Sequence, residues 1–179
     1  MTRPLIMVAP NGARRGVADH PQLPVTLAAT VTTARQCHAA GAGALHLHVR
    51  DDAGAHTLDA GRYREALAEL ALAVPGMAVQ ITTESAGLFA PEAQFACLRA
   101  VRPAWASIAA REIGRDAALA PRLYAFCAAE GVRVQHIAYD LGDLECLARW
   151  RAAGILGPGQ DEVICVLGRY QPPRAGGPG

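Results

Sequence analysis

The residues best suited to chemistry in this sequence are two histidines, His46 and His48, in the stretch ALHLHVRDD at positions 44–52. This composition predicts a β-strand that runs into a polar loop. Because successive side chains on a strand alternate between its faces, His46, His48 and Arg50 are expected on one side. Two imidazoles on one rigid face are half of a metal site of the kind that zinc commonly takes. The same pattern also fits two buried, hydrogen-bonded histidines or a polar strand end, and a metal site requires a third ligand from elsewhere.

Length and composition indicate one compact α/β domain. The chain has 179 residues, of which 51% are hydrophobic and 18% charged, so residues 1–170 are expected to form a single domain and residues 171–179 a Pro/Gly-rich tail. A net charge of +1 gives no general electrostatic attraction to nucleic acid or to an anionic membrane. No apolar run approaches the roughly 20 residues of a membrane-spanning helix. The first residues lack a signal-peptide pattern, and the five scattered cysteines fit reduced thiols. We therefore expect a cytoplasmic protein with small-molecule partners.

The sequence contains no lysine, because all 17 basic residues are arginine. This excludes chemistry that proceeds through a lysine Schiff base, including that of pyridoxal phosphate enzymes. It also excludes a phosphate-binding loop of the kind that requires a lysine. If the protein acts on a carbonyl carbon, a metal ion or hydrogen bonds must polarise that carbonyl.

Around the histidines, predicted strands and helices alternate, and the strands begin about 30 residues apart. The predicted strands are 5–9, 44–50, 78–82, 105–109, 133–139 and 162–167, and the predicted helices are 24–40, 59–74, 91–101, 116–130 and 143–153. This alternation is typical of βαβ units on a parallel sheet. The sheet is either an open doubly wound sheet or a (β/α)8 barrel of which only about six βα units are present. No GxGxxG motif follows the first strand, which disfavours a dinucleotide-binding domain.

In both architectures the ligand site lies at the carboxyl ends of the strands. The polar residues predicted there are Asn11, Arg14, His46, His48, Arg50, Thr82, Thr83, Glu84, Ser85, Ser107, Arg111, Glu112, Tyr139, Asp140, Arg169 and Tyr170. Such a set of cations, hydroxyls and histidines suits an anionic small molecule with a carbonyl oxygen. Structural interpretations are also open, with Thr82 and Thr83 as strand formers and Ser85 as a helix cap.

For four of the remaining polar residues we expect a structural role and not a chemical one. Arg111 and Glu112 are expected to form a solvated pair, and His136 is expected to be a core or interface histidine. His56 is expected to be an ordinary surface residue. For His136, this expectation follows from the absence of a nearby partner in the sequence.

Over almost its whole length to about residue 170, the chain resembles the β-keto acid cleavage enzyme family, whose named member is the 3-keto-5-aminohexanoate cleavage enzyme. The resemblance rests on AGAGALHLHVRDDAGAHTLD at 40–59, VQITTES at 79–85 and the run Pro103–Ser107. The segments GVRVQHIAYD at 131–140 and VICVLGRYQP at 163–172 look like the shorter-chain branch of the family. The HLHVRD block with its downstream TLD is the most specific of these motifs.

The resemblance implies a (β/α)8 barrel that binds a divalent metal ion, usually zinc. It also implies cleavage of a β-keto acid with acetyl-CoA to give acetoacetate and a new acyl-CoA, and a homo-oligomer. By motif, the metal ligands are His46 and His48. The candidate catalytic residues are Arg50 and Ser107, and the candidate substrate-binding residues are Asn11, Arg14, Thr82, Thr83 and Ser85.

The sequence departs from the family pattern in three places. Glu84 and Ser85 stand where the family usually has two glycines, which narrows the pocket or changes its charge. Gln135, His136 and Ile137 stand where acidic residues are common. The family's third ligand, a glutamate, belongs to strands later than those found here, so we expect an incomplete barrel with two open sheet edges, prone to aggregation or to pairing with another chain.

Two other functions are weighed against cleavage. One is a non-catalytic or inactive truncated relative. The other is a metal-dependent hydrolase of the amidohydrolase type, which also uses an HxH motif. That class places HxH on the first strand and needs further histidines, for which only His136 is a candidate.

Overall fold

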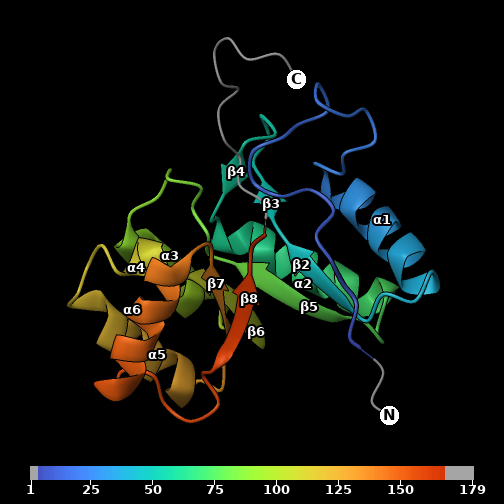
Figure 1. Ribbon diagram of the computed structural model, residues 1–179. Helices are drawn as coiled ribbons and strands as arrows, with labels where there is room; N and C mark the ends of the chain where they lie inside the picture. The colour runs from blue at the N-terminus through green and yellow to red at the C-terminus, as the bar shows by residue number, and fades with distance from the viewer. Residues whose placement is uncertain (1–3, 168–179) are drawn as a thin grey trace, which may run out of the picture.

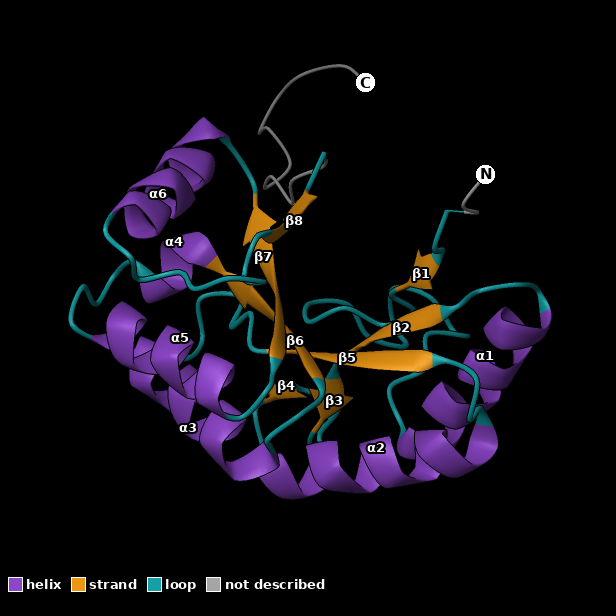
Figure 2. Cartoon of the chain, turned by 90° about the horizontal axis from the view of Figure 1, so that it is seen from below, coloured by secondary structure: helices purple, strands orange, loops and turns teal. Residues whose placement is uncertain are grey.

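The computed structural model describes residues 4–167, in which six strands form one parallel sheet in the order β1-β2-β5-β6-β7-β8. The strands are β1 (Met7–Val8), β2 (Ala44–Leu47), β5 (Ala78–Thr82), β6 (Trp105–Ala109), β7 (Arg133–Ala138) and β8 (Glu162–Cys165). Figure 2 shows that the sheet curls and that the helices form an outer layer around its convex side. Within the described residues the sheet is open, with β1 and β8 at its edges. The chain therefore has the fold of part of a (β/α)8 barrel, as predicted.

Three of the helices begin at a side chain that caps the first turn. The helices are α1 (Leu27–Ala39), α2 (Ala60–Ala73), α3 (Pro91–Val101), α4 (Ala110–Ile113), α5 (Leu119–Ala129) and α6 (Leu141–Ala152). The oxygens of Thr26, Asp59 and Asp140 accept the backbone N–H three residues ahead, at the starts of α1, α2 and α6. The predicted cap at Asp59 is confirmed. The helix predicted at 116–130 begins later, at Leu119, and α4 was not predicted because its four residues are too few to show a helical period.

The predicted strand at 44–50 is not continuous. It is interrupted at His48, and β3 (Val49–Arg50) then pairs antiparallel with β4 (His56–Thr57). The turn between them is closed by the Asp51 N–H, which donates to the Ala55 carbonyl at 2.8 Å. Figure 1 shows this hairpin at the same end of the molecule as the loop that follows β1. Interruption of the strand here places a second layer of residues over the carboxyl end of β2.

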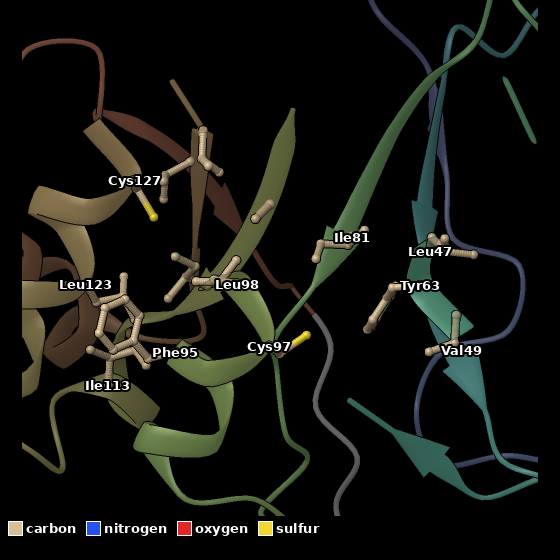
Figure 3. Packing of buried hydrophobic residues seen from close by; sticks show 14 of the residues in the cluster. Leu47, Val49, Tyr63, Ile81, Phe95, Cys97, Leu98, Ile113, Leu123 and Cys127 are labelled. Atoms are coloured by element: carbon tan, nitrogen blue, oxygen red, sulfur yellow. The ribbon is translucent and has the colours of Figure 1, made fainter. Parts of the chain in front are cut away.

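The hydrophobic core lies between the sheet and the helices. All five residues of β6 are buried, as expected for a strand in the middle of a parallel sheet. Figure 3 shows Leu47, Tyr63 and Ile81 in one part of the core, and Phe95, Leu98 and Leu123 in the other. The Tyr63 hydroxyl donates to the Thr82 carbonyl at 2.8 Å, which ties α2 to the end of β5. The core thus fixes the strand ends that carry the polar residues.

The two edges of the sheet carry exposed apolar residues. On β8, Val163 and Ile164 are 40% and 37% exposed, and before β1, Leu5 and Ile6 are 58% and 56% exposed. Both edges therefore offer unpaired backbone groups beside apolar side chains. No helix among residues 4–167 is long and apolar enough to cross a membrane. The predicted tail at 171–179, and the strand-end candidates Arg169 and Tyr170, lie outside the described residues.

Candidate active site at the carboxyl ends of the strands

A cavity of about 430 Å³ opens at the carboxyl ends of the sheet. Residues that follow each of the six strands of the sheet contribute to the wall of this cavity. These are Gly12, Ala13 and Arg14 after β1, His48 after β2, Glu84, Ala86 and Gly87 after β5, Arg111 and Glu112 after β6, Tyr139 after β7, and Val166 after β8. The cavity lies where a ligand site is expected in a barrel of this class.

His46 and His48 meet at this end of the sheet, as predicted. Their Nε2 atoms lie 3.2 Å apart, and their rings pack edge to face with centroids 5.0 Å apart. His46 pairs in register with Gln80 of β5, and its Nδ1 donates to the Gln80 Oε1 at 2.7 Å. Because an amide oxygen only accepts, His46 carries its proton on Nδ1 and a lone pair on Nε2. Gln80 in turn donates to Gln135 Oε1 at 3.1 Å, so a polar chain across three strands fixes the ring of His46.

Both histidines are held in the neutral form. Burial lowers the pKa of His46, while the hydrogen bond with Gln80 and the negative charge of Glu84 oppose this shift. Burial lowers the pKa of His48 well below its usual value, and the neighbouring His46, His56 and Arg50 lower it further. A neutral imidazole presents a nitrogen lone pair, which is the form that binds a metal ion.

The spacing of the two imidazoles fits one metal ion. Two nitrogens that each lie about 2.0–2.1 Å from the same tetrahedral zinc ion are roughly 3.3 Å apart, close to the 3.2 Å between the two Nε2 atoms. Within residues 4–167, no three His, Cys, Asp or Glu side chains are placed to hold a single ion. The described residues therefore provide two nitrogen ligands and not a third carboxylate or imidazole.

The prediction that His56 is an ordinary surface residue is wrong. His56 is 5% exposed, and its ring packs against His48 with centroids 5.2 Å apart. Its Nε2 lies 3.0 Å from the Glu84 carbonyl, which joins the β3–β4 hairpin to the loop after β5. Sequence reasoning missed it because the antiparallel hairpin, which folds β4 back over the site, was not predicted.

Arg50 organises the loops around the cavity. Its guanidinium donates to the backbone carbonyls of Asn11, Gly12, Arg15 and Gly54, at 2.7–3.1 Å. The Asn11 side chain donates to the carbonyls of Pro24 and His48, at 3.2 and 3.0 Å. The predicted catalytic role of Arg50 and the predicted substrate contact of Asn11 stay predictions. The contacts present hold the β1 loop against the His48 backbone.

The candidate substrate-binding residues after β5 lie together but differ in their contacts. The Thr82 hydroxyl accepts the Glu84 N–H at 3.1 Å, and Thr83 donates to the Ser107 carbonyl at 3.3 Å. The Ser85 hydroxyl donates to Glu112 Oε1 at 2.6 Å. Ser107 is fully buried, and its hydroxyl has no hydrogen-bond partner among the described residues. The roles predicted for these four residues stay predictions.

The prediction that Arg111 and Glu112 form a solvated pair is wrong. Glu112 accepts the Ser85 N–H at 2.8 Å and Gln94 Nε2 at 3.0 Å in addition to the Ser85 hydroxyl. Arg111 donates to both oxygens of Asp143, and its guanidinium lies 4.8 Å from the centroid of the Tyr139 ring. These contacts link the ends of β5, β6 and β7. No local pattern predicts them, because every partner is at least 18 residues away.

Tyr139 donates its hydroxyl to Glu84 Oε1 at 2.9 Å inside the cavity. Burial raises the pKa of Tyr139, the adjacent Glu84 carboxylate raises it further, and the positive charge of Arg14 opposes the shift. The phenol therefore stays protonated at neutral pH and acts as a hydrogen-bond donor. Arg14 and Tyr139 were both predicted at this end of the sheet, and the structure places both on the cavity wall.

His136 lies apart from this cluster, as predicted for a core histidine. It is 1% exposed, its Nε2 lies 3.1 Å from the Gln160 carbonyl, and its Nδ1 lies 3.3 Å from the Tyr124 hydroxyl of α5. Its ring therefore faces the helix layer. His136 therefore does not supply the further histidine that an amidohydrolase-type site would need.

Comparison with known proteins identifies related sequences. A family model described as beta-keto acid cleavage enzyme matches residues 4–177. The 3-oxoadipate:acetyl-CoA acetyltransferase of Cupriavidus necator is 32% identical over 84 residues, which are 46% of this chain and 30% of that protein. The 3-keto-5-aminohexanoate cleavage enzyme of Fusobacterium nucleatum is 31% identical over 86 residues, 48% of this chain and 32% of that protein. The alignments thus span about a third of these relatives' length.

Solved structures show the same fold. The binary complex of ObcA with oxaloacetate matches 80% of this chain and 37% of its own chain, with a TM-score of 0.65 and 17% sequence identity. The ternary complex of ObcA with a C4-CoA adduct and oxalate matches 81% of this chain and 37% of its own, with a TM-score of 0.59 and 16% identity.

Proposed function

Because this chain belongs to the β-keto acid cleavage enzyme family, we propose that it takes part in the cleavage of a β-keto acid with acetyl-CoA to give acetoacetate and a new acyl-CoA. The observation that carries the proposal is the match of the family over residues 4–177 together with the neutral His46–His48 pair at the cavity. One curated relative is named as an acetyl-CoA acetyltransferase of a 3-oxo acid, and a structure of similar fold holds a CoA adduct. The alignments span only about a third of these relatives, so the activity is proposed for this chain and is not carried over from them.

The reaction exchanges acyl groups between carbon and sulfur. Removal of a proton from C2 of the β-keto acid gives an enolate, and C2 attacks the thioester carbon of acetyl-CoA, so a C–C bond forms and the C–S bond breaks. The CoA thiolate then attacks the original keto carbon, a new C–S bond forms, and the bond from that carbon to C2 breaks. The released acetoacetate enolate takes up the proton. The sequence of steps balances without a lysine, which the chain lacks.

In this proposal His46 and His48 hold a divalent metal ion, which we expect to be zinc. When bound, the ion polarises the keto oxygen and so lowers the cost of forming the enolate. Gln80 keeps the His46 Nε2 lone pair directed at the site through the 2.7 Å bond to Nδ1. Within residues 4–167 no third His, Cys, Asp or Glu side chain is placed to join them on a single ion.

The hydroxyl and amide groups around the cavity are proposed to orient the substrate. Ser107 does not line the cavity, but it is proposed as one of these groups because its buried hydroxyl has no partner among residues 4–167. Arg14, on the cavity wall, is proposed to meet the variable end of the substrate. Arg50 is proposed to act on the reaction through the loop it holds.

A homo-oligomer in the cytoplasm is also proposed. The exposed apolar residues on the edge strand β8 support association through that edge. All five cysteines are free thiols, which fits a reducing compartment.

The test is acyl-CoA formation. The purified protein, supplied with zinc, is incubated with acetyl-CoA and a panel of β-keto acids, and the new acyl-CoA is identified by mass spectrometry. We expect product with the native chain and loss of at least about a hundredfold with the His46→Ala/His48→Ala double variant. His20→Ala, which removes an exposed histidine that does not line the cavity, serves as the control. Product formation equal in all three proteins, or absent from the native protein, contradicts the proposal.

A further inference from the structure

Two carboxylates line the cavity, and only one of them is available for chemistry. Glu112 accepts three hydrogen bonds, from the Ser85 N–H, the Ser85 hydroxyl and Gln94 Nε2, at 2.6–3.0 Å. Glu84 accepts one, from the Tyr139 hydroxyl to Oε1 at 2.9 Å. Within residues 4–167 no other hydrogen bond or ion pair reaches the Glu84 carboxylate. Its Oε2 can therefore accept a proton from a ligand.

The backbone of Glu84 is held in place on both sides. Its N–H donates to the Thr82 hydroxyl at 3.1 Å, and its carbonyl lies 3.0 Å from His56 Nε2. Glu84 follows β5, which pairs in register with β2, the strand of His46. Its negative charge also opposes the lowering of the pKa of His46 and His56 by burial.

The hydroxyl that reaches Glu84 is itself fixed. The Tyr139 ring lies under the Arg111 guanidinium, at 4.8 Å from ring centroid to Cζ. Arg111 is anchored by Asp143 at 2.6 Å and by Asp140 at 2.8 Å. Tyr139 thus presents a fixed donor to Oε1 of Glu84, and Glu84 lines the same cavity as His48 and Tyr139.

We propose that Glu84 is a catalytic proton-transfer residue, which removes the C2 proton of the β-keto acid and later returns it to the acetoacetate enolate. Tyr139 is a positioning residue that orients the Glu84 carboxylate. The inference rests on the proposed function, because it assigns the residue that makes and quenches the enolate of that reaction. In the first step the C2–H bond breaks, its electron pair stays on the substrate as the enolate, and the proton moves to Oε2. In the last step the same proton forms the C2–H bond of acetoacetate, so no external acid or base is consumed.

The test is deuterium exchange at C2 of the β-keto acid in D2O without acetyl-CoA, followed by proton NMR against a protein-free sample. Exchange requires only removal of the C2 proton and its return, so the experiment measures proton transfer separately from acyl transfer. We expect the native protein to accelerate exchange and Glu84→Gln to reduce that acceleration by about a hundredfold or more, since positioned bases contribute this much. Gln keeps an oxygen that can accept the Tyr139 hydroxyl, and an unchanged melting temperature establishes that the variant is folded.

Two further variants sharpen the result. Glu65→Gln makes the same charge change at an exposed residue of α2 and is expected to exchange like the native protein. Tyr139→Phe keeps the ring beneath Arg111 but removes the donor, and is expected to lower the exchange kcat about tenfold with KM unchanged.

The outcomes separate the two proposals. Native-like exchange in Glu84→Gln overturns the role of Glu84, and acyl transfer by the native protein then still supports the proposed function. Exchange that depends on Glu84 without any acyl transfer supports the proton-transfer role and contradicts the cleavage reaction. No acceleration by the native protein overturns the role of Glu84.

Discussion

Replacement of Glu112 by alanine is expected to destabilise the protein strongly, although Glu112 is a charged residue on a four-residue helix. Its carboxylate accepts the Ser85 N–H at 2.8 Å, the Ser85 hydroxyl at 2.6 Å and Gln94 Nε2 at 3.0 Å. Ser85 and Gln94 are both fully buried. The substitution leaves these donors without an acceptor, and each unsatisfied buried donor costs about 1–3 kcal/mol.

The expected loss is about 3–4 kcal/mol in the free energy of unfolding. This is the lower end of the sum for three donors, because water from the adjoining cavity can replace part of the carboxylate. The assay is equilibrium unfolding in urea, followed by circular dichroism, at pH 7.5. Glu92→Ala is the matched control, because Glu92 makes one exposed ion pair with Arg122 at 3.7 Å, and its loss is expected to cost less than about 0.5 kcal/mol. A loss below about 1 kcal/mol for Glu112→Ala, with an unchanged m-value, refutes the reasoning that Glu112 joins β5, α3 and α4.

Three further perturbations have defined outcomes. The Arg50→Lys variant cannot reproduce the four carbonyl contacts of the guanidinium. It is expected to lose about 2–3 kcal/mol of unfolding free energy in urea and to expose the β1 loop to proteolysis. Resistance to protease equal to that of the native protein contradicts this. Tyr63→Phe removes the buried hydroxyl bond to Thr82 and is expected to cost about 1–2 kcal/mol, measured by the same unfolding; a neutral effect contradicts it. Burial lowers the pKa of His136 below its value in the unfolded chain. Above about pH 6.5 His136 is neutral in both the folded and the unfolded protein. Below that pH the unfolded protein binds a proton on His136 that the folded protein does not bind. Stability is therefore expected to fall as the pH drops from about 6.5, by up to about 1.4 kcal/mol per pH unit for each such histidine, and more weakly in His136→Gln; equal slopes in the two proteins contradict this.

The parts of the fold that could be predicted are those encoded by local patterns. The helix that begins at Pro91 and the strand Trp105–Ala109 have the predicted bounds, and the helix capped by Asp59 differs from its predicted bounds by one residue at each end. The histidine pair was predictable for the same reason, since the alternation of side chains on a strand is a local rule. The parallel direction of the strands then follows from repeated strand–helix–strand units.

The parts that could not be predicted depend on contacts distant in the sequence. The position of His56 depends on the β3–β4 hairpin, which has only two residues in each strand and so shows no alternation. The partner of Glu112 is 27 residues away at Ser85, and the partner of Tyr139 is 55 residues away at Glu84. No spacing rule connects such positions, although residues that end neighbouring parallel strands are expected at one edge.

The most direct test of the central claim, that His46 and His48 form a metal site, is the metal content of the purified chain. The native protein, freed of loosely bound ions by chelator and reloaded with zinc, is compared with the His46→Ala/His48→Ala double variant by mass spectrometry of the metal, with circular dichroism as the check on folding. About one zinc ion per native chain, lost in the folded double variant, is the predicted result for two nitrogen ligands 3.2 Å apart. A folded native protein without zinc, or a double variant that retains it, contradicts the account.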